Sequence, residues 1–236
     1  TVKTVYATLL ALLLFIPRRK WGKDKEKIKS LLMIGGFILL LTLLSKLPYM
    51  LLNIEDNGNS LASEQLKYIL NNPFDYGITI LRSIKNLFNY YLSGIVGTFG
   101  LLDTNLITPF VFFFFIGFIL VGISDISLCE KKVTVFNRII VILAVLASAF
   151  GIFTAMYIFW TSGLEGLGVG ADIISGVQGR YFIPLLSTTF LIFSNDWISK
   201  NRNLKKVAQI LLNNCYLLSI VILILSVLTI IFRYWC

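Results

Sequence analysis

Long apolar runs constrain the fold of this chain more than any other feature. Six stand out among its 236 residues, and most are close to the roughly 20 residues that an α-helix needs to cross a bilayer. With 57% hydrophobic residues, the chain has too little polar surface for a soluble domain. The sequence therefore predicts an all-α, polytopic transmembrane bundle of about six helices, at residues 2–16, 30–52, 108–124, 139–159, 181–195 and 209–232.

Short connections between these runs carry most of the positive charge. Residues 18–29, 124–138 and 195–208 hold seven, three and four Lys and Arg, whereas six lie in segments predicted to face the opposite side. Short loops rich in Lys and Arg stay in the cytoplasm. We therefore expect a multi-pass protein of the cell membrane with cytoplasmic basic loops and with residues 53–107 and 160–180 outside. Topology then explains the net charge of +9, and no nucleic-acid partner is predicted.

The first apolar run is one of the shorter ones. It ends at Pro17 after too few residues to cross about 30 Å of hydrocarbon, and no charged segment or cleavage site marks a signal peptide. We interpret residues 1–236 as a single membrane domain that forms the C-terminal part of a longer protein.

The outer segment 53–107 is too long to lack secondary structure. From Pro73 to Tyr91, apolar residues recur every three or four positions, which is typical of an amphipathic helix in the membrane interface. A shorter helix is predicted from Ser63, as its cap, to Asn71. Glycines then interrupt the pattern at Gly94, Gly97 and Gly100. These features predict an outer cap of interfacial helices.

The composition excludes several kinds of site. There is no histidine, so a Ser-His-Asp or Cys-His nucleophile is excluded and no imidazole is available for zinc. The three cysteines fall at different predicted depths, so neither a disulfide nor a metal site is predicted. No cofactor is predicted, and the need for a divalent metal stays open.

The strongest candidate site is the string Gly176-Val177-Gln178-Gly179-Arg180-Tyr181-Phe182-Ile183-Pro184, where an arginine meets the start of an apolar run. In one interpretation Arg180 reaches the interface and fixes the depth of a helix. In the other its guanidinium binds a phosphate, helped by backbone N–H groups at a helix start, by Gly179 and by Gln178.

This string resembles the bacterial predicted membrane proteins of domain-of-unknown-function family 2142. Trp160-Thr161 and the segment Gly97-Thr98-Phe99-Gly100-Leu101-Leu102-Asp103-Thr104 add to the resemblance, which covers most of the chain. That family looks related to the type C membrane glycosyltransferases. The resemblance implies transfer of a sugar from a polyprenyl-phosphate donor to a glycan acceptor at the outer membrane face. It also implies that Arg180, Gln178, Gly179 and Tyr181 bind the donor, and that the catalytic carboxylate lies upstream of Thr1.

Other polar residues leave alternatives open. Asp103 could orient an acceptor hydroxyl as a catalytic group, or cap a turn through Thr104. Glu165 and Asp172 share a glycine-rich loop that could move over a site, although flexibility alone would explain those glycines. Lys46 could reach the interface or pair with an anion in the bundle.

Two further functions compete with glycosyl transfer. A transporter or a flippase for lipid-linked saccharides would line its path with Arg180 and Lys46, but transporters place their sites near the bilayer midplane. A non-catalytic scaffold of the cell envelope would use Arg180 only as an anchor.

Overall fold

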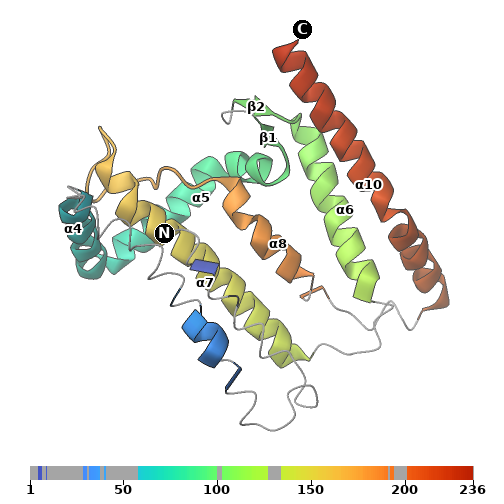
Figure 1. The fold of residues 1–236 in the computed structure, drawn as a ribbon, viewed down its shortest axis with the longest axis horizontal. Helices are drawn as coiled ribbons and strands as arrows, with labels where there is room; N and C mark the ends of the chain where they lie inside the picture. Colours follow the sequence, from blue (N-terminus) through green and yellow to red (C-terminus); the bar gives the residue numbers. More distant parts are fainter. Residues whose placement is uncertain are drawn as a thin grey trace. The chain divides into compact units, whose positions relative to one another are not determined.

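The computed structural model describes residues 58–99, 103–126, 134–190 and 201–235, together with residues 5, 6, 9, 29, 30, 32–37, 40, 192 and 193. Helices dominate these residues (Figure 1). The chain divides into two compact units: residues 1–83 with 143–176, and residues 84–142 with 177–236. The elements are α4 (Gly58–Asn71), α5 (Pro73–Val96), β1 (Thr98–Phe99), β2 (Thr104–Asn105), α6 (Thr108–Ile126), α7 (Val135–Phe159), η2 (Thr161–Gly163), η3 (Gly179–Phe182), α8 (Ile183–Thr189) and α10 (Arg202–Tyr234).

In the first unit, α4, the start of α5 and most of α7 enclose a small core. The Tyr76 ring stacks on the Tyr157 ring with 5.4 Å between centroids, and its hydroxyl lies 2.6 Å from the Thr154 hydroxyl. Ile152 and Ile174 are fully buried beside apolar neighbours. The Thr79, Ser83 and Tyr157 hydroxyls in this core form hydrogen bonds, whereas the buried Gln65 Nε2 atom has no partner among the described residues.

In the second unit, α6 and α10 run side by side, and the β1–β2 hairpin lies near the C-terminal end of α10 (Figure 1). Gly117 of α6 allows this approach, because a Cβ there would lie 2.6 Å from Leu218 Cδ2. In the hairpin Thr98 pairs with Asn105 and Phe99 with Thr104. This antiparallel ladder is a small departure from the predicted all-α fold.

Two helical stretches of the described residues are long and apolar enough to cross a membrane. They are Val135–Gly163 and Arg202–Tyr234, while Thr108–Ser124 is apolar but shorter. The most apolar window of Arg202–Tyr234 has no buried residue, unlike the core helix of a soluble protein. Helices at the predicted positions 108–124, 139–159 and 209–232 are therefore confirmed.

The predicted membrane helix at 181–195 is wrong in length. After the short 3-10 helix η3, α8 covers only seven residues and ends at Thr189. Together these elements span about 18 Å, well short of a 30 Å hydrocarbon core. The hydroxyls of Ser187, Thr188 and Thr189 each donate to a carbonyl three residues earlier, a bond that competes with the helical pattern.

Other predicted boundaries also move. α10 begins at Arg202, so part of the basic loop predicted at 195–208 is helical; the Asn201 side chain caps it by accepting from the Asn203 and Leu204 N–H groups. α4 begins at Gly58, and the Ser63 hydroxyl donates to the Ser60 carbonyl inside the helix, so Ser63 is not its cap. Residues 2–16 and 30–52 lie mostly outside the described residues, as does Lys46.

Helix α5 starts at Pro73 as predicted but continues to Val96. Its buried face is largely polar, with Tyr76, Thr79, Ser83 and Tyr91. The predicted apolar face is exposed, with Phe74, Ile78, Leu81, Ile84 and Phe88. Only Tyr91 departs from that assignment, because it is buried. An outward apolar face is typical of a helix in contact with lipid.

Candidate functional site

The string that contains Arg180 forms a turn followed by a helix start. Gly176 has a φ of 81°, in the left-handed region that favours glycine. Gln178 is extended and precedes η3, which begins at Gly179 and continues into α8. Pro184 occupies the first turn of α8, where its missing N–H has no cost. The helix start predicted at this string is confirmed.

Gly179 packs directly on the backbone of α5. A Cβ at Gly179 would overlap the Tyr91 carbonyl oxygen and lie 2.6 Å from the Gly94 carbonyl carbon. Conversely, a Cβ at Gly94 would lie 3.0 Å from the Gly179 nitrogen. The two glycines thus bring η3 against α5. The prediction that Gly94 interrupts the helix is wrong: it lies within α5 and serves this contact.

A small pocket of about 30 Å³ opens beside these glycines. It holds one or two waters or a hydroxyl-sized group, not a whole sugar. Three of the four residues predicted to bind a donor line it, and the other three lining residues are new. The lining residues are Tyr90, Gly94, Thr98, Gln178, Gly179 and Arg180. The glycine inside an amphipathic helix was the one signal in the sequence for this approach.

Polar groups at the pocket are incompletely paired. Within the part of the chain that the structure describes, the Gln178 Oε1 atom is buried and accepts no hydrogen bond. Arg180 is exposed and forms no ion pair with a described residue; its guanidinium carbon lies 6.0 Å from the Tyr181 ring centroid. Tyr181 itself does not line the pocket. A buried acceptor and an exposed cation can together bind an anion that carries hydroxyl groups.

Tyr91 stays protonated at neutral pH. Burial raises the pKa of its phenol to about 12, and the neighbouring Tyr90 adds to this rise. The Tyr91 ring also packs edge-on against Phe182, with 6.0 Å between ring centroids. Tyr91 therefore supports η3 by packing and is not a proton acceptor at physiological pH.

Asp103 lies at the hairpin, away from the pocket lining. Its Oδ1 atom accepts from the Thr104 hydroxyl at 3.2 Å, and its Oδ2 atom is 3.5 Å from Arg233 Nη2 at the end of α10. The contact with Thr104 matches the turn-capping alternative. The ion pair adds an attachment of the hairpin to α10.

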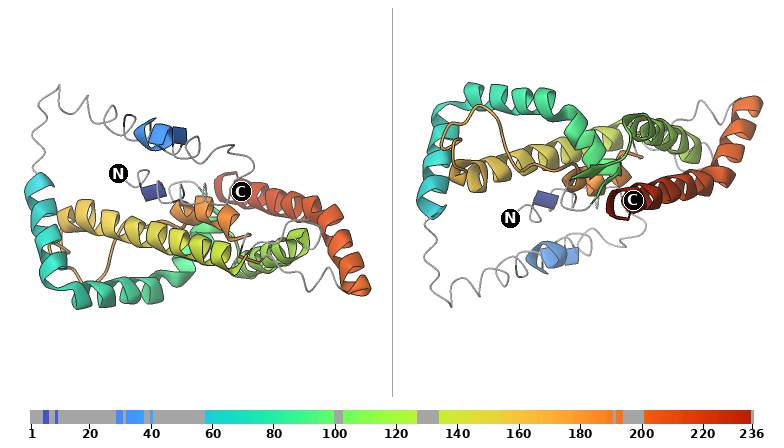
Figure 2. Two further views of the ribbon diagram at one scale, coloured as in Figure 1. Left: turned by 90° about the horizontal axis from the view of Figure 1, so that it is seen from below. Right: turned by 90° about the horizontal axis from the view of Figure 1, so that it is seen from above.

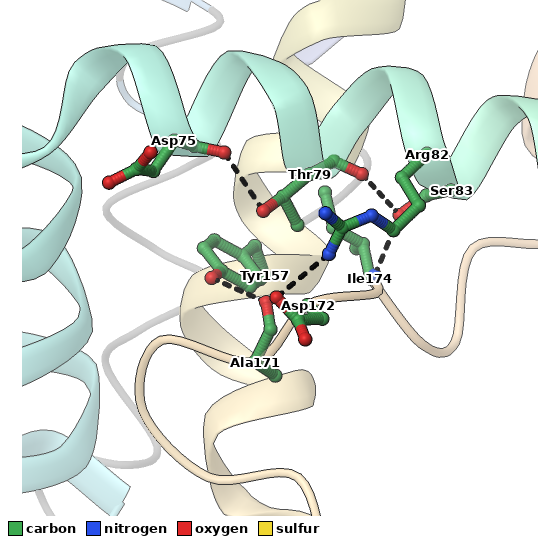
Figure 3. A network of polar contacts seen from close by, with 8 residues as sticks. All are labelled: Asp75, Thr79, Arg82, Ser83, Tyr157, Ala171, Asp172 and Ile174. Atoms are coloured by element: carbon green, nitrogen blue, oxygen red, sulfur yellow. Dashed lines mark hydrogen bonds and ion pairs between the residues drawn. The ribbon is translucent and has the colours of Figure 1, made fainter.

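The loop 164–176 is held by side chains of the surrounding helices (Figure 3). In chain order, Gln65 accepts from the Gly170 N–H, Tyr157 donates to the Ala171 carbonyl, Arg82 pairs with Asp172 at 2.8 Å, Ser83 accepts from the Ile174 N–H, and Thr161 accepts from the Ser175 N–H. Its glycines have a structural cause, because Gly166, Gly168 and Gly170 have φ of 84°, 67° and 78°. These bonds explain the loop better than the predicted mobility over a site.

Among the described residues, no group of three or more His, Cys, Asp or Glu side chains is placed to hold a metal ion.

Comparison with known proteins gives one match. Residues 1–189 match the family described as "Predicted membrane protein (DUF2142)". No curated protein and no solved structure matches this chain. The matched region includes the pocket and ends before α10.

Proposed function

The chain belongs to the DUF2142 family of predicted membrane proteins, and we propose that it binds a polyprenyl-phosphate-linked sugar at the Gln178–Arg180 pocket. We further propose that the protein takes part in transferring that sugar to a glycan acceptor, as a membrane glycosyltransferase of type C does. In this proposal the protein is multi-pass, its short basic loops are cytoplasmic, and the pocket faces outward.

The observation that carries the proposal is the pairing of a cation with a buried, unpartnered acceptor at one pocket. The Arg180 guanidinium supplies forked donors that match a phosphate. The Gln178 Oε1 atom needs a donor such as a sugar hydroxyl. A sugar phosphate presents both groups in one molecule.

The pocket volume limits how such a donor binds. A hydroxyl-sized group fits the enclosed part, so the phosphate and most of the sugar lie at the mouth beside Arg180. The backbone contact between Gly94 and Gly179 fixes the position of Arg180 at the start of η3. The exposed Arg180 side chain can then reach a phosphate at the mouth of the pocket.

In the proposed reaction an acceptor hydroxyl attacks the anomeric carbon of the donor. The bond between that carbon and the phosphate oxygen breaks, and its electrons remain on the departing phosphate. Arg180 stabilises the charge that grows there. The hydroxyl proton passes to a carboxylate, a residue type that the pocket lining does not include.

The direct test compares Arg180→Lys and Arg180→Gln in the complete protein. Binding is measured to a polyprenyl-phosphate sugar and, in parallel, to polyprenol without phosphate. We expect glutamine to weaken binding of the phosphate by about 1.5–3 kcal/mol, and lysine to recover part of this loss. Binding of polyprenol should not change.

Lys67→Gln is the matched control, because Lys67 is exposed on α4 and lies outside the pocket. If both Arg180 variants bound and transferred the donor normally, the phosphate assignment would fall and Arg180 would be an interface anchor. If donor binding fell but no transfer were detected in the parent protein, the site would instead serve transport of the lipid-linked sugar.

Orientation needs its own measurement. Single cysteines are introduced at Lys67 and Asn203 after removal of the native cysteines. Both side chains are exposed, and the cap at Asn201 uses only the backbone N–H of Asn203. An impermeant reagent applied to intact cells should label position 67 only. Labelling of position 203 alone would reverse the topology.

A further inference from the structure

Helix α10 is longer than a membrane crossing requires. Its 33 residues extend about 50 Å, whereas the hydrocarbon core is about 30 Å thick. Its polarity changes at Asn213 and Asn214. All but one of its basic residues lie before these asparagines, and residues 215–232, which lie after them, are uncharged. Residues 215–234 alone are long enough to cross the core. Residues 202–214 are therefore not needed to cross the hydrocarbon core and can lie outside it.

The shape of α10 agrees with this division. Both views of Figure 2 show the helix bending between a shorter N-terminal part and a longer C-terminal part. The Asn214 side-chain amide donates to the Ile210 carbonyl at 2.7 Å. A side chain that bonds to this carbonyl enters the helical hydrogen-bond ladder, which is a known cause of bending.

Residues 202–214 present three different faces. Successive residues turn by about 100°, so Arg202, Lys206, Gln209 and Asn213 share one polar face, with Lys205 beside them. Ala208 is buried on the side toward the protein. Between these faces, Val207 and Ile210 are 53% and 62% exposed. Asn203 and Asn214 are exposed on the same side, so this strip combines apolar and amide side chains. Such a strip beside a basic one matches the boundary between hydrocarbon and lipid headgroups.

The charge distribution specifies the partner. Arg202, Lys205 and Lys206 lie near the N-terminus of α10, where the helix dipole disfavours cations, and the helix contains no acidic residue to compensate them. An external negative surface removes this repulsion. Anionic headgroups supply it at the same depth at which the apolar strip meets hydrocarbon.

We infer that residues 202–214 lie in the membrane interface and bind anionic phospholipid headgroups through Arg202, Lys205 and Lys206. This inference does not rest on the proposed function, because it concerns a segment beyond residues 1–189, where the family match ends. The segment is a membrane-surface contact that adjoins the span formed by the rest of α10.

The first test uses two neighbouring positions. Spin labels are placed at Val207→Cys or Gln209→Cys in the complete protein, with Cys129, Cys215 and Cys236 replaced by serine, in phosphatidylglycerol-containing nanodiscs. Both side chains are exposed in the structure, so neither label disturbs packing. We expect the label at 207 to meet oxygen from the bilayer and the label at 209 to meet a water-soluble nickel chelate. Equal access of the chelate to both positions would overturn the interfacial placement.

The second test measures which lipid the protein retains. In nanodiscs of mixed phosphatidylglycerol and phosphatidylcholine, enrichment of phosphatidylglycerol around the protein is compared for the parent and for R202Q/K205Q/K206Q. We expect a loss of about fivefold per charge at low salt, and a smaller difference at high salt. The variant K205R/K206R should retain the enrichment. The control K67Q/K85Q removes two exposed charges elsewhere and should also retain it.

Two outcomes would contradict the choice of partner. Unchanged enrichment in the triple variant would remove these residues from lipid binding. If inorganic phosphate protected position 206 from chemical modification in phosphatidylcholine nanodiscs as well as anionic lipid does, the charges would serve a soluble anion instead.

Discussion

Residues 170–175 and residues 178–180 are close neighbours in the sequence, yet they differ in whether their polar groups have hydrogen-bond or ion-pair partners. In the first segment the surrounding helices pair with Gly170, Ala171, Asp172, Ile174 and Ser175. In the second, the Gln178 Oε1 atom is buried without a partner, and Arg180 is exposed without an ion pair among the described residues.

The difference indicates what each segment is for. Paired backbone groups give a loop one stable conformation, because breaking any bond leaves a buried group unsatisfied. A buried unpaired group costs stability, so it calls for a water, an ion or a ligand to complete it. The first segment is thus structural, and the second is the place to look for a ligand.

The largest expected effect comes from Gly179→Ala. The new methyl group meets backbone atoms of α5, which cannot rotate away, so we expect the free energy of unfolding to fall by about 3 kcal/mol and donor binding to be lost. Thermal unfolding in detergent gives the first value. Gly163→Ala is the control, since a Cβ there meets nothing within 4 Å; similar losses in both variants would argue against a specific contact.

Ser83→Ala tests the paired segment. Its hydroxyl is fully buried and accepts from the Ile174 N–H at 2.8 Å, so its loss leaves a buried donor unpaired. We expect a destabilisation of about 1–3 kcal/mol and faster proteolysis within residues 164–176. Ser187→Ala removes an exposed hydroxyl and should have little effect. A Ser83 variant as stable as the parent would show that the loop does not depend on this bond.

Gln178→Leu should separate binding from stability. Because the Oε1 atom has no partner in the described residues, its removal should leave the free energy of unfolding unchanged or slightly raised. Binding of the polyprenyl-phosphate sugar should weaken by about 1 kcal/mol, while binding of polyprenol should not change. A marked loss of stability would mean that Gln178 is structural, like the residues that hold the preceding loop.

The smallest effect is expected for Arg82→Gln. The ion pair with Asp172 is short, but the two side chains are 44% and 86% exposed. Exposed pairs contribute about 0.2–1 kcal/mol and are screened by salt. Denaturation at low and high salt should show a small difference that disappears with salt. A larger, salt-independent loss would make Arg82 a principal support of the loop.

Regular features could be predicted from the sequence. Uninterrupted apolar runs indicated α6, α7 and most of α10, and Asn72-Pro73 marked the start of α5. The length of α8 was not predicted. Hydroxyl-to-backbone bonds at Thr188 and Thr189 do not by themselves explain it, because Ser226 and Thr229 form similar bonds within the continuous α10. The first turns of α10 were assigned to a loop because they are rich in Lys and Arg, although Asn201 is a residue type that commonly caps a helix.

Only the part of the candidate site that residues 178–180 form was predicted from the sequence. Gln178, Gly179 and Arg180 were identified because they are adjacent in the sequence, whereas Tyr90 and Gly94 come from α5 and Thr98 comes from β1. Such tertiary partners leave no local pattern. The same limit applies to the bonds that hold residues 170–175, since each needs a side chain from a distant helix.

The attachment of the hairpin to α10 connects a helix that is long and apolar enough to cross a membrane with one wall of the pocket. Arg233, in the last turn of α10, pairs with Asp103, and Thr98, across the same hairpin, both pairs with Asn105 and lines the pocket. A helix responds to a thinner or thicker hydrocarbon layer by tilting. Tilting of α10 would displace Arg233 and, through the hairpin, Thr98. The thickness of the host membrane would then change the width of the pocket without a ligand bound at a second site.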